Sequence, residues 1–205
     1  MRSTPVYKTF QSFILAATMA LSFAVSPVAA GEPTKQLKSG IGAVLDILRD
    51  TKLQGESKKS ERRVKLRNAI GKQFDFEEMA RRSLARYWKK RNKEERKEFV
   101  SLFSGILGKS YIGKIEGYTD EKIRYLKEKK DDEFARVKTL IVTKRKQEIP
   151  ITYRMHKVDK KWMVYDVIIE GVSLVNTYRQ QFRSILRKAS FDVLVKRLRE
   201  KQGEG

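Results

Sequence analysis

The chain has 205 residues, 40% hydrophobic content, a formal net charge of +21, one histidine and no cysteine. This length suits one domain with a sizeable core. The lack of cysteine excludes disulfides and thiolate metal ligands, and a single histidine provides too little for a zinc centre. We therefore expect neither a metalloenzyme nor a bound cofactor.

Residues 1–30 have the features of a secretory signal. Two cations precede an apolar run over 13–25, and small residues at 28–30 suit a signal peptidase. The apolar run is shorter than the ~20 residues that span a membrane, and no cysteine offers a lipid attachment point. We predict a cleaved signal peptide over 1–30 and an exported chain over 31–205 that forms a single domain.

Removal of residues 1–30, which hold two cations and no acid, lowers the net charge from +21 to +19. Inside a cell this charge would favour nucleic acid, but export argues against that partner. The remaining anionic partners are membrane surfaces, lipid phosphates and acidic proteins. The alternative is that basic runs such as 127–130 are solvated faces balanced by nearby acids.

The first half of the exported chain has helical periodicity. Thr34 can cap a first helix with an apolar stripe from Leu37 to Leu48, and a second helix carries Val64, Leu66 and Ile70. Asp75 with Glu78, and Asn92 with Glu95, are start signals for two further helices. Glycines at 105, 108, 113 and 117 predict a bend or break near Gly108 or Gly113 in the longer one.

From residue 119 the hydrophobic period falls to two, which indicates strands. Apolar positions alternate with charged ones over 122–125, 136–143 and 149–155, and a fourth strand follows over 162–169. The connections 144–147 and 158–160 are short and polar, so the strands should be antiparallel neighbours. Helices followed by a curved meander and covering helices predict an α+β fold.

The period changes again within 161–186. Both faces of the fourth strand are apolar except at Asp166, so this strand should be covered on both sides. Gly171 supplies a joint, after which Leu174, Tyr178 and Phe182 lie on one helical face, and Ser190 can cap a last helix. A helix that folds back over this sheet leaves room for an enclosed apolar space.

Catalytic motifs are absent from the sequence, which has no phosphate-binding glycine loop, no GxSxG elbow and no Cys/His pair. His156 is interpreted as a surface residue. Asp166 is the alternative to consider, since an apolar setting would raise the pKa of a carboxyl and suit it to act as a general base. The opposing interpretation is that an arginine such as Arg81, Arg82 or Arg86 keeps Asp166 ionised, or that its carboxylate accepts backbone hydrogen bonds. With no second catalytic partner, we expect no enzyme.

Three blocks of the sequence carry a family resemblance. They are FDFEEMARRSLARYW from Phe74, KEFVSLFSGILGKSY from Lys97 and WMVYDVIIEGVSLVNTYRQQFRSILRKASFDVLVKRL from Trp162. Together they resemble the MlaC family of exported phospholipid carriers, also called toluene-tolerance or auxiliary transport proteins. The family commonly has glycine where Ala85 stands, and the strong basicity is a second departure.

The resemblance implies a periplasmic shuttle that carries phospholipid between an outer-membrane lipoprotein complex and an inner-membrane ABC transporter, and so maintains outer-membrane lipid asymmetry. It implies an NTF2-like cone with a four-stranded antiparallel sheet and an apolar pocket. The acyl chains would lie between sheet and helices, with the headgroup outside. We expect a monomer with phospholipid as cargo, no nucleic acid partner, and room for transient contact with a membrane surface.

An acyl chain needs apolar walls, and the sequence holds more large apolar and aromatic residues than a two-layer core requires. The residues that we predict to line the lipid pocket are Leu84, Trp88, Phe103, Ile106, Tyr111, Ile141, Tyr153, Val164 and Val167. Leu107 and Tyr165 are alternatives for any of them. The rival hypothesis is an exported enzyme of similar shape with Asp166 as general base on a small apolar substrate.

Overall fold

The computed structural model describes residues 31–118 and 121–203, so the predicted signal peptide lies outside the described residues. Six α-helices and three short 3₁₀ segments occur in this part of the chain. The helices are α1 (Glu32–Arg49), α2 (Lys59–Gly71), α3 (Phe76–Leu84), α4 (Lys93–Glu116), α5 (Leu174–Leu186) and α6 (Phe191–Gly203). The 3₁₀ segments are Thr51–Leu53, Glu56–Lys58 and Ala85–Lys90.

The strands form one antiparallel meander between α4 and α5. They are β1 (Lys122–Lys130), β2 (Phe134–Val142), β3 (Glu148–Val158), β4 (Lys161–Ile169) and β5 (Val172–Ser173), and they lie in chain order across the sheet. The predicted α+β class and antiparallel neighbours are confirmed. Four strands were predicted; the fifth is only two residues long and pairs with the end of β4, too short to leave a periodic signal.

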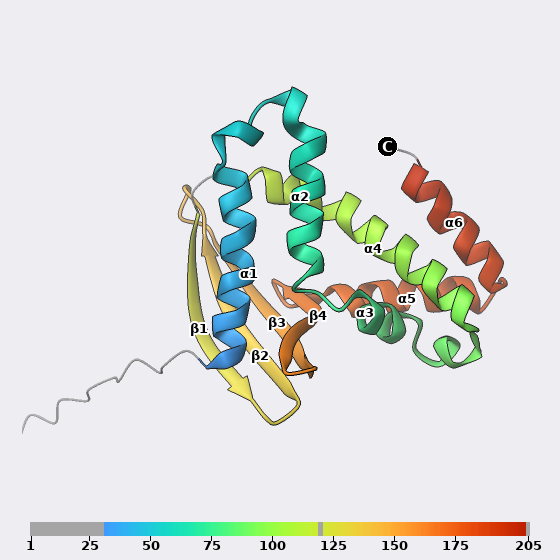
Figure 1. Cartoon of the computed structure of the whole chain (residues 1–205). Coiled ribbons are helices and arrows are strands. Elements are labelled where there is room, and N and C mark those ends of the chain that lie inside the picture. The colour runs from blue at the N-terminus through green and yellow to red at the C-terminus, as the bar shows by residue number, and fades with distance from the viewer. Residues whose placement is uncertain (1–30, 119–120, 204–205) are drawn as a thin grey trace, which may run out of the picture.

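The apolar side chains form two clusters that meet at β4. Figure 1 shows the arrangement of the elements that carry them. Helix α1 packs on one face of the sheet through Leu37, and α3 to α6 gather into a helical cluster beyond β4. Within β4, Trp162 and Val164 belong to the sheet cluster and Tyr165 to the helical cluster. The prediction that this strand is covered on both faces is therefore confirmed.

Helix starts follow the predicted capping residues in three cases, one of them Ser190, whose hydroxyl accepts from the Val193 N–H of α6 at 3.4 Å. The Asp75 carboxylate accepts from the Glu78 N–H at 2.9 Å, and Asn92 with Glu95 forms a reciprocal capping box. The Thr34 cap is wrong, because Gly31 precedes α1 with a proline in the first turn. Thr34 instead donates to Glu128 of β1, which anchors α1 to the sheet edge.

Helix α4 is continuous through Gly108 and Gly113, so the predicted break does not occur. Its last turn is held to α2 by Glu116, which accepts from the Arg62 Nε at 3.2 Å and the Arg63 Nη2 at 2.8 Å. Hydrogen bonding from Arg63, together with the charges of both arginines, holds the pKa of Glu116 below its usual value. This carboxylate therefore stabilises the contact between α2 and α4 only while it is ionised.

We predict that Glu116→Gln lowers the free energy of unfolding by about 1–2 kcal/mol at pH 7. The pKa of Glu116 is lower in the folded than in the unfolded state, so its contribution is complete above the unfolded pKa. It is lost as pH falls through the folded pKa. Urea unfolding at neutral and acidic pH should show the variant approaching wild type in acid. Glu61→Gln on the exposed face of α2 is the control and should leave the free energy of unfolding nearly unchanged.

The end of α3 is strained at Ala85, the position where the resemblance described above leads us to expect glycine in many relatives. Ala85 adopts φ 49° and ψ −122° and closes α3 with its N–H bonded to the Arg81 carbonyl. A side chain in this region costs of order 1–3 kcal/mol. The departure from the family pattern therefore has a measurable energetic consequence.

We predict that Ala85→Gly raises the free energy of unfolding by about 1 kcal/mol, because glycine adopts this backbone conformation without a Cβ penalty. Ala80→Gly, within the same helix and fully buried, should instead lower it by about 1 kcal/mol or more. Thermal and urea unfolding of both variants gives the comparison. A loss of stability in Ala85→Gly would contradict the assignment of strain.

Candidate functional site

The strands present an apolar face to α1, which we call the inner face. Strand register builds it in rows, with Ile123 opposite Ile141 and Ile141 opposite Ile149. The next row contains Thr139 between Tyr125 and Ile151. Because side chains alternate across a strand, the charged residues between these positions lie on the other face.

Burial changes along the inner face. Near the α1 N-terminus, the side chains of Val137, Met155, Trp162 and Val164 are fully buried with Leu37. Toward the turn between β2 and β3, apolar side chains of the same face keep solvent-accessible area. They are Ile123, Ile141, Ile149 and Ile169, with Ile41 of α1 and Leu174 of α5 also partly buried against this cluster. One end of the inner face is therefore apolar and incompletely packed.

Two tyrosines on this face lie in surroundings that disfavour charge. Burial raises the pKa of Tyr125 to about 12, and the nearby Tyr118 is a smaller cause. Burial also raises the pKa of Tyr153, with Tyr125 as the smaller cause. Tyr153 nevertheless keeps some accessible area. Both phenols are therefore neutral hydrogen-bonding groups within an otherwise apolar wall.

The nine predicted pocket residues fall into the two clusters. Five belong to the helical cluster and four to the inner face: Leu84, Trp88, Phe103, Ile106 and Tyr111 in the first, and Ile141, Tyr153, Val164 and Val167 in the second. Of the nine, Tyr111, Ile141 and Tyr153 retain accessible area and the other six are buried. Their role as lipid contacts stays a prediction.

The helical members are packed by their own neighbours. Phe103 lies 5.0 Å from Tyr178 and 5.6 Å from Phe182, ring centre to ring centre, and stacks on Phe99 at 5.9 Å. The prediction did not include residues of α1 that face the sheet, although the apolar stripe beginning at Leu37 was visible in the sequence. It also missed Ile149 and Ile169, which share the period-two pattern of the residues that were named.

A groove of about 740 Å³ runs between α1, α2 and the start of β4. Gln36, Gly40 and Ile47 line it from α1, and Ala69 and Lys72 from α2. It lies beside the sheet cluster at Trp162, whose backbone N–H donates to Gln36. The groove is mixed in character and presents no group of acids or histidines.

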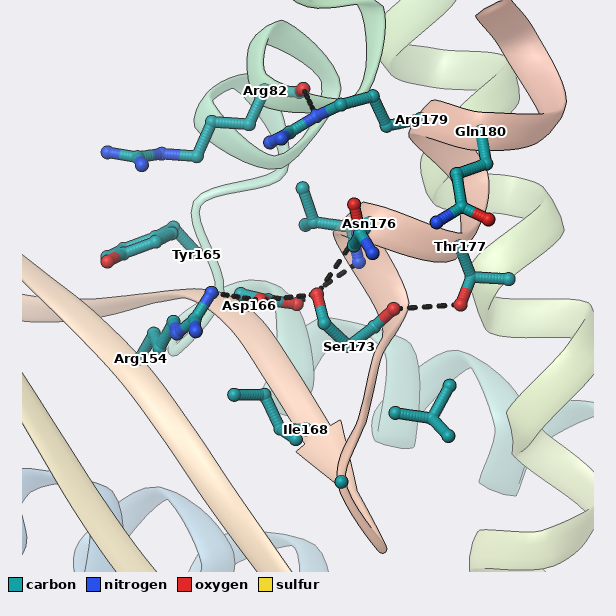
Figure 2. Close-up of a pocket in the computed structure, with 13 residues that line it drawn as sticks. Arg82, Arg154, Tyr165, Asp166, Ile168, Ser173, Asn176, Thr177, Arg179 and Gln180 are labelled. Carbon is teal, nitrogen blue, oxygen red and sulfur yellow. Dashed lines mark hydrogen bonds and ion pairs between the residues drawn. The ribbon is translucent and has the colours of Figure 1, made fainter. Parts of the chain in front are cut away.

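A second cavity, of about 540 Å³, lies where β4, β5 and α5 meet (Figure 2). At its floor, Asp166 accepts from the Arg154 Nη1 at 3.2 Å, the Ser173 hydroxyl at 2.7 Å and the Val175 N–H at 3.1 Å. Ser173 also caps α5, accepting from the Asn176 N–H at 3.0 Å. The carboxylate thus joins two strands to the first turn of a helix.

Arginines form the upper wall of this cavity (Figure 2). The guanidinium of Arg82 lies 4.0 Å from the centre of the Tyr165 ring, and the Arg179 Nε donates to the Arg82 carbonyl at 2.9 Å. These contacts hold α3 and α5 together above β4. The cavity is therefore cationic, with its one acid at the floor already bonded.

The two kinds of partner predicted for Asp166, an arginine and a backbone N–H, are both present, but the arginine is a different one. Arg154, directly opposite on β3, is the ion-pair partner, rather than Arg81, Arg82 or Arg86. Asp166 is 1% exposed and its oxygens serve the fold, which gives no support to a general base here. His156 is half buried rather than a free surface residue, and its Nε2 lies 2.9 Å from Asp75 Oδ2.

Two further features are absent from the described part of the chain. No group of three or more histidine, cysteine or acidic side chains could hold a metal ion there. Within residues 31–118 and 121–203, no helix is long and apolar enough to cross a membrane. The described residues therefore offer an apolar face, a groove and a basic cavity as candidate sites.

Comparisons with known proteins agree with these features. A curated relative, the intermembrane phospholipid transport system binding protein MlaC of Haemophilus influenzae, is 24% identical over 140 residues. The alignment spans 66% of this chain and 65% of the relative, so somewhat less than two thirds of that protein is matched. A solved phospholipid-binding protein from Ralstonia solanacearum, in complex with a phospholipid, is 22% identical with a TM-score of 0.77. It covers 85% of this chain and 98% of its own.

The structural match shows that the two proteins share a fold. Family assignment comes from the sequence profile of the MlaC protein family, which matches residues 38–200 and thus most of the chain. That range includes all nine predicted pocket residues and every strand of the sheet. The chain therefore belongs to the MlaC family.

Proposed function

We propose that this protein is a periplasmic phospholipid carrier. The acyl chains of the bound lipid lie against the incompletely packed end of the inner face, toward the turn between β2 and β3. The observation that carries the proposal is the incompletely packed apolar row at Ile123, Ile141 and Ile149, facing α1. The family assignment supports it, as do the two relatives, one a phospholipid-binding protein and the other a binding protein of an intermembrane phospholipid transport system.

A carrier must keep hydrocarbon out of water. A chain of about 16 carbons is worth roughly 13 kcal/mol of transfer free energy at ~0.8 kcal/mol per methylene, which makes free diffusion of the lipid negligible. Apolar side chains that keep solvent-accessible area are suitable lipid contacts, because a bound acyl chain can cover the apolar surface that the protein itself leaves exposed to water. Neutral Tyr125 and Tyr153 can meet a lipid ester without burying a charge.

The same family assignment supports a cellular role for the proposed carrier. Residues 1–30 act as a cleaved signal that delivers residues 31–205 to the periplasm as a single domain. There the monomeric protein exchanges phospholipid with an outer-membrane lipoprotein complex and an inner-membrane ABC transporter, and so maintains outer-membrane lipid asymmetry. No cofactor or catalytic step is needed, since transfer requires only binding and release.

Native mass spectrometry of the purified protein, followed by lipid extraction, tests the proposal. We expect two-chain phospholipid at close to one molecule per protein. A protein that is always empty, or one that carries a single small molecule of another class, would overturn it.

A paired substitution on β2 tests the cargo face. Ile141→Asn places an amide on the inner face, and we expect a roughly tenfold loss of lipid affinity, because an unpartnered amide against acyl chains costs about 1–3 kcal/mol. Leu140→Asn is the matched control, since Leu140 lies next in the strand on the opposite face and is also partly accessible. It should leave lipid occupancy unchanged.

Thermal unfolding of both variants shows whether each is folded before lipid is extracted. Equal loss of lipid from both folded variants would contradict the assignment of cargo to the inner face. Equal retention would do the same.

Asp166→Asn separates a carrier from an enzyme. We expect the variant to lose about 2–3 kcal/mol of stability, because Arg154 and Ser173 lose their charged acceptor. The folded fraction should carry as much lipid as wild type, measured by mass spectrometry below the unfolding midpoint. Loss of a chemical turnover in folded Asp166→Asn protein would instead favour the exported enzyme.

A further inference from the structure

The outer face of the sheet, opposite α1, carries cations in direct register. Lys127 of β1 lies opposite Lys138 of β2. One row further, Lys129 lies opposite Arg136, and Arg136 lies opposite Arg154 of β3. We call these five residues the basic sheet face; they follow from the alternation that sends apolar residues to the inner face.

Within the described part of the chain, most of these charges have no acidic partner. Arg154 pairs with Asp166. Among the described residues, no ion pair joins Lys127, Lys129, Arg136 or Lys138 to an acid, and all four are exposed. Like charges directly opposite on neighbouring strands destabilise a sheet. The basic sheet face is therefore unfavourable for the isolated fold, unlike a solvated face in which acids alternate with bases.

We propose that the basic sheet face docks on the surface of an anionic phospholipid bilayer. Its composition favours this partner over an acidic protein, because lysine is depleted in protein interfaces, whose centres are built from buried apolar and aromatic anchors. Cations spread over a sheet suit a surface of many mobile phosphates, where each contributes separately. No cleft or stacking platform for a nucleic acid strand is needed by such a surface.

Exposed apolar residues border the same face. Phe134 is 44% exposed and lies two residues before Arg136, so that both point from the outer face of β2. Leu126 is 51% exposed at the irregularity that precedes Lys127. Amphipathic surfaces of this kind bind bilayers through charge attraction together with shallow apolar contact. Docking in this orientation leaves α1 and the inner face directed away from the bilayer.

The docking is separate from cargo binding, since it uses the opposite side of the strands. Flotation of the full protein with vesicles tests it, using phosphatidylcholine alone or with about 30% phosphatidylglycerol, at low salt and again near 0.5 M salt. We expect binding only to the anionic vesicles and its loss at high salt. Near an anionic leaflet each cation is worth about a fivefold change in partitioning, so K129Q/R136Q/K138Q should bind roughly 100-fold less.

The matched control removes the same residue types from the C-terminal helices. K188Q/K196Q/R197Q changes three exposed cations around α6, which Figure 1 places away from the sheet. This variant should keep most of the binding. Equal losses in the two variants would show a general charge effect and overturn the proposal, as would binding of wild type to neutral vesicles or to none.

A stability measurement provides an independent check that the sheet variant is folded. Because Lys138 opposes Lys127, K138Q should raise the thermal midpoint by about 1–3 °C while it weakens vesicle binding. A variant that is more stable yet binds less well cannot owe its loss to unfolding. If K138Q lowered the midpoint, the cations would be structural and the proposal would fail. If an acidic protein, rather than vesicles, bound in a manner sensitive to the sheet variant, the bilayer would be the wrong partner.

Discussion

The carboxylate of Asp166 joins three parts of the fold that follow one another along the chain. It accepts from Arg154 on β3, from Ser173 after the β4–β5 turn, and from the Val175 N–H in the first turn of α5. A carboxyl group that is 1% exposed is tolerated because an arginine, a hydroxyl and an N–H at a helix N-terminus all bond to it. The sheet and the helical cluster are therefore held in a fixed relation at β4.

That relation explains why the two apolar clusters differ in how completely they are packed. Beyond β4, the rings of Phe99, Phe103 and Phe182 fill the space among α3 to α6. Between α1 and the sheet, packing is complete only near Leu37 and Trp162, while Ile141 and Ile149 remain partly accessible. The closely packed helical cluster can thus support the sheet, while the far end of the inner face is left free to meet a ligand.

Local signals in the sequence were sufficient for the element types. The change of period within 161–186 predicted a doubly covered strand followed by a helix, and Asp75 and Asn92 marked two helix starts. Long-range pairing was less accessible. Arg154 meets Asp166 because the β3–β4 register shifts next to this pair, and hydrophobic periodicity does not reveal such a shift.

The candidate site was predicted less well than the fold, for a related reason. An aromatic residue on an amphipathic helix has the same pattern whether it faces cargo or another ring, so Phe103 and Trp88 could not be distinguished from Tyr111. Thr34 had a capping residue's chemistry, but its hydroxyl was taken by Glu128, distant in sequence. In both cases tertiary contacts decide between roles that local chemistry leaves equal.

The two faces of the sheet follow from one alternation but answer different demands. The inner-face residues Val137, Thr139 and Ile141 face α1, whereas nothing in that packing determines the sign of charge at Arg136 and Lys138. Alternating acids and bases across the strands would have stabilised the outer face by a few tenths of a kcal/mol per pair. Cations opposite cations are the costlier choice for the fold, and the proposed anionic bilayer would offset that cost. The outer face therefore carries information about the surroundings of the protein that the apolar inner face does not.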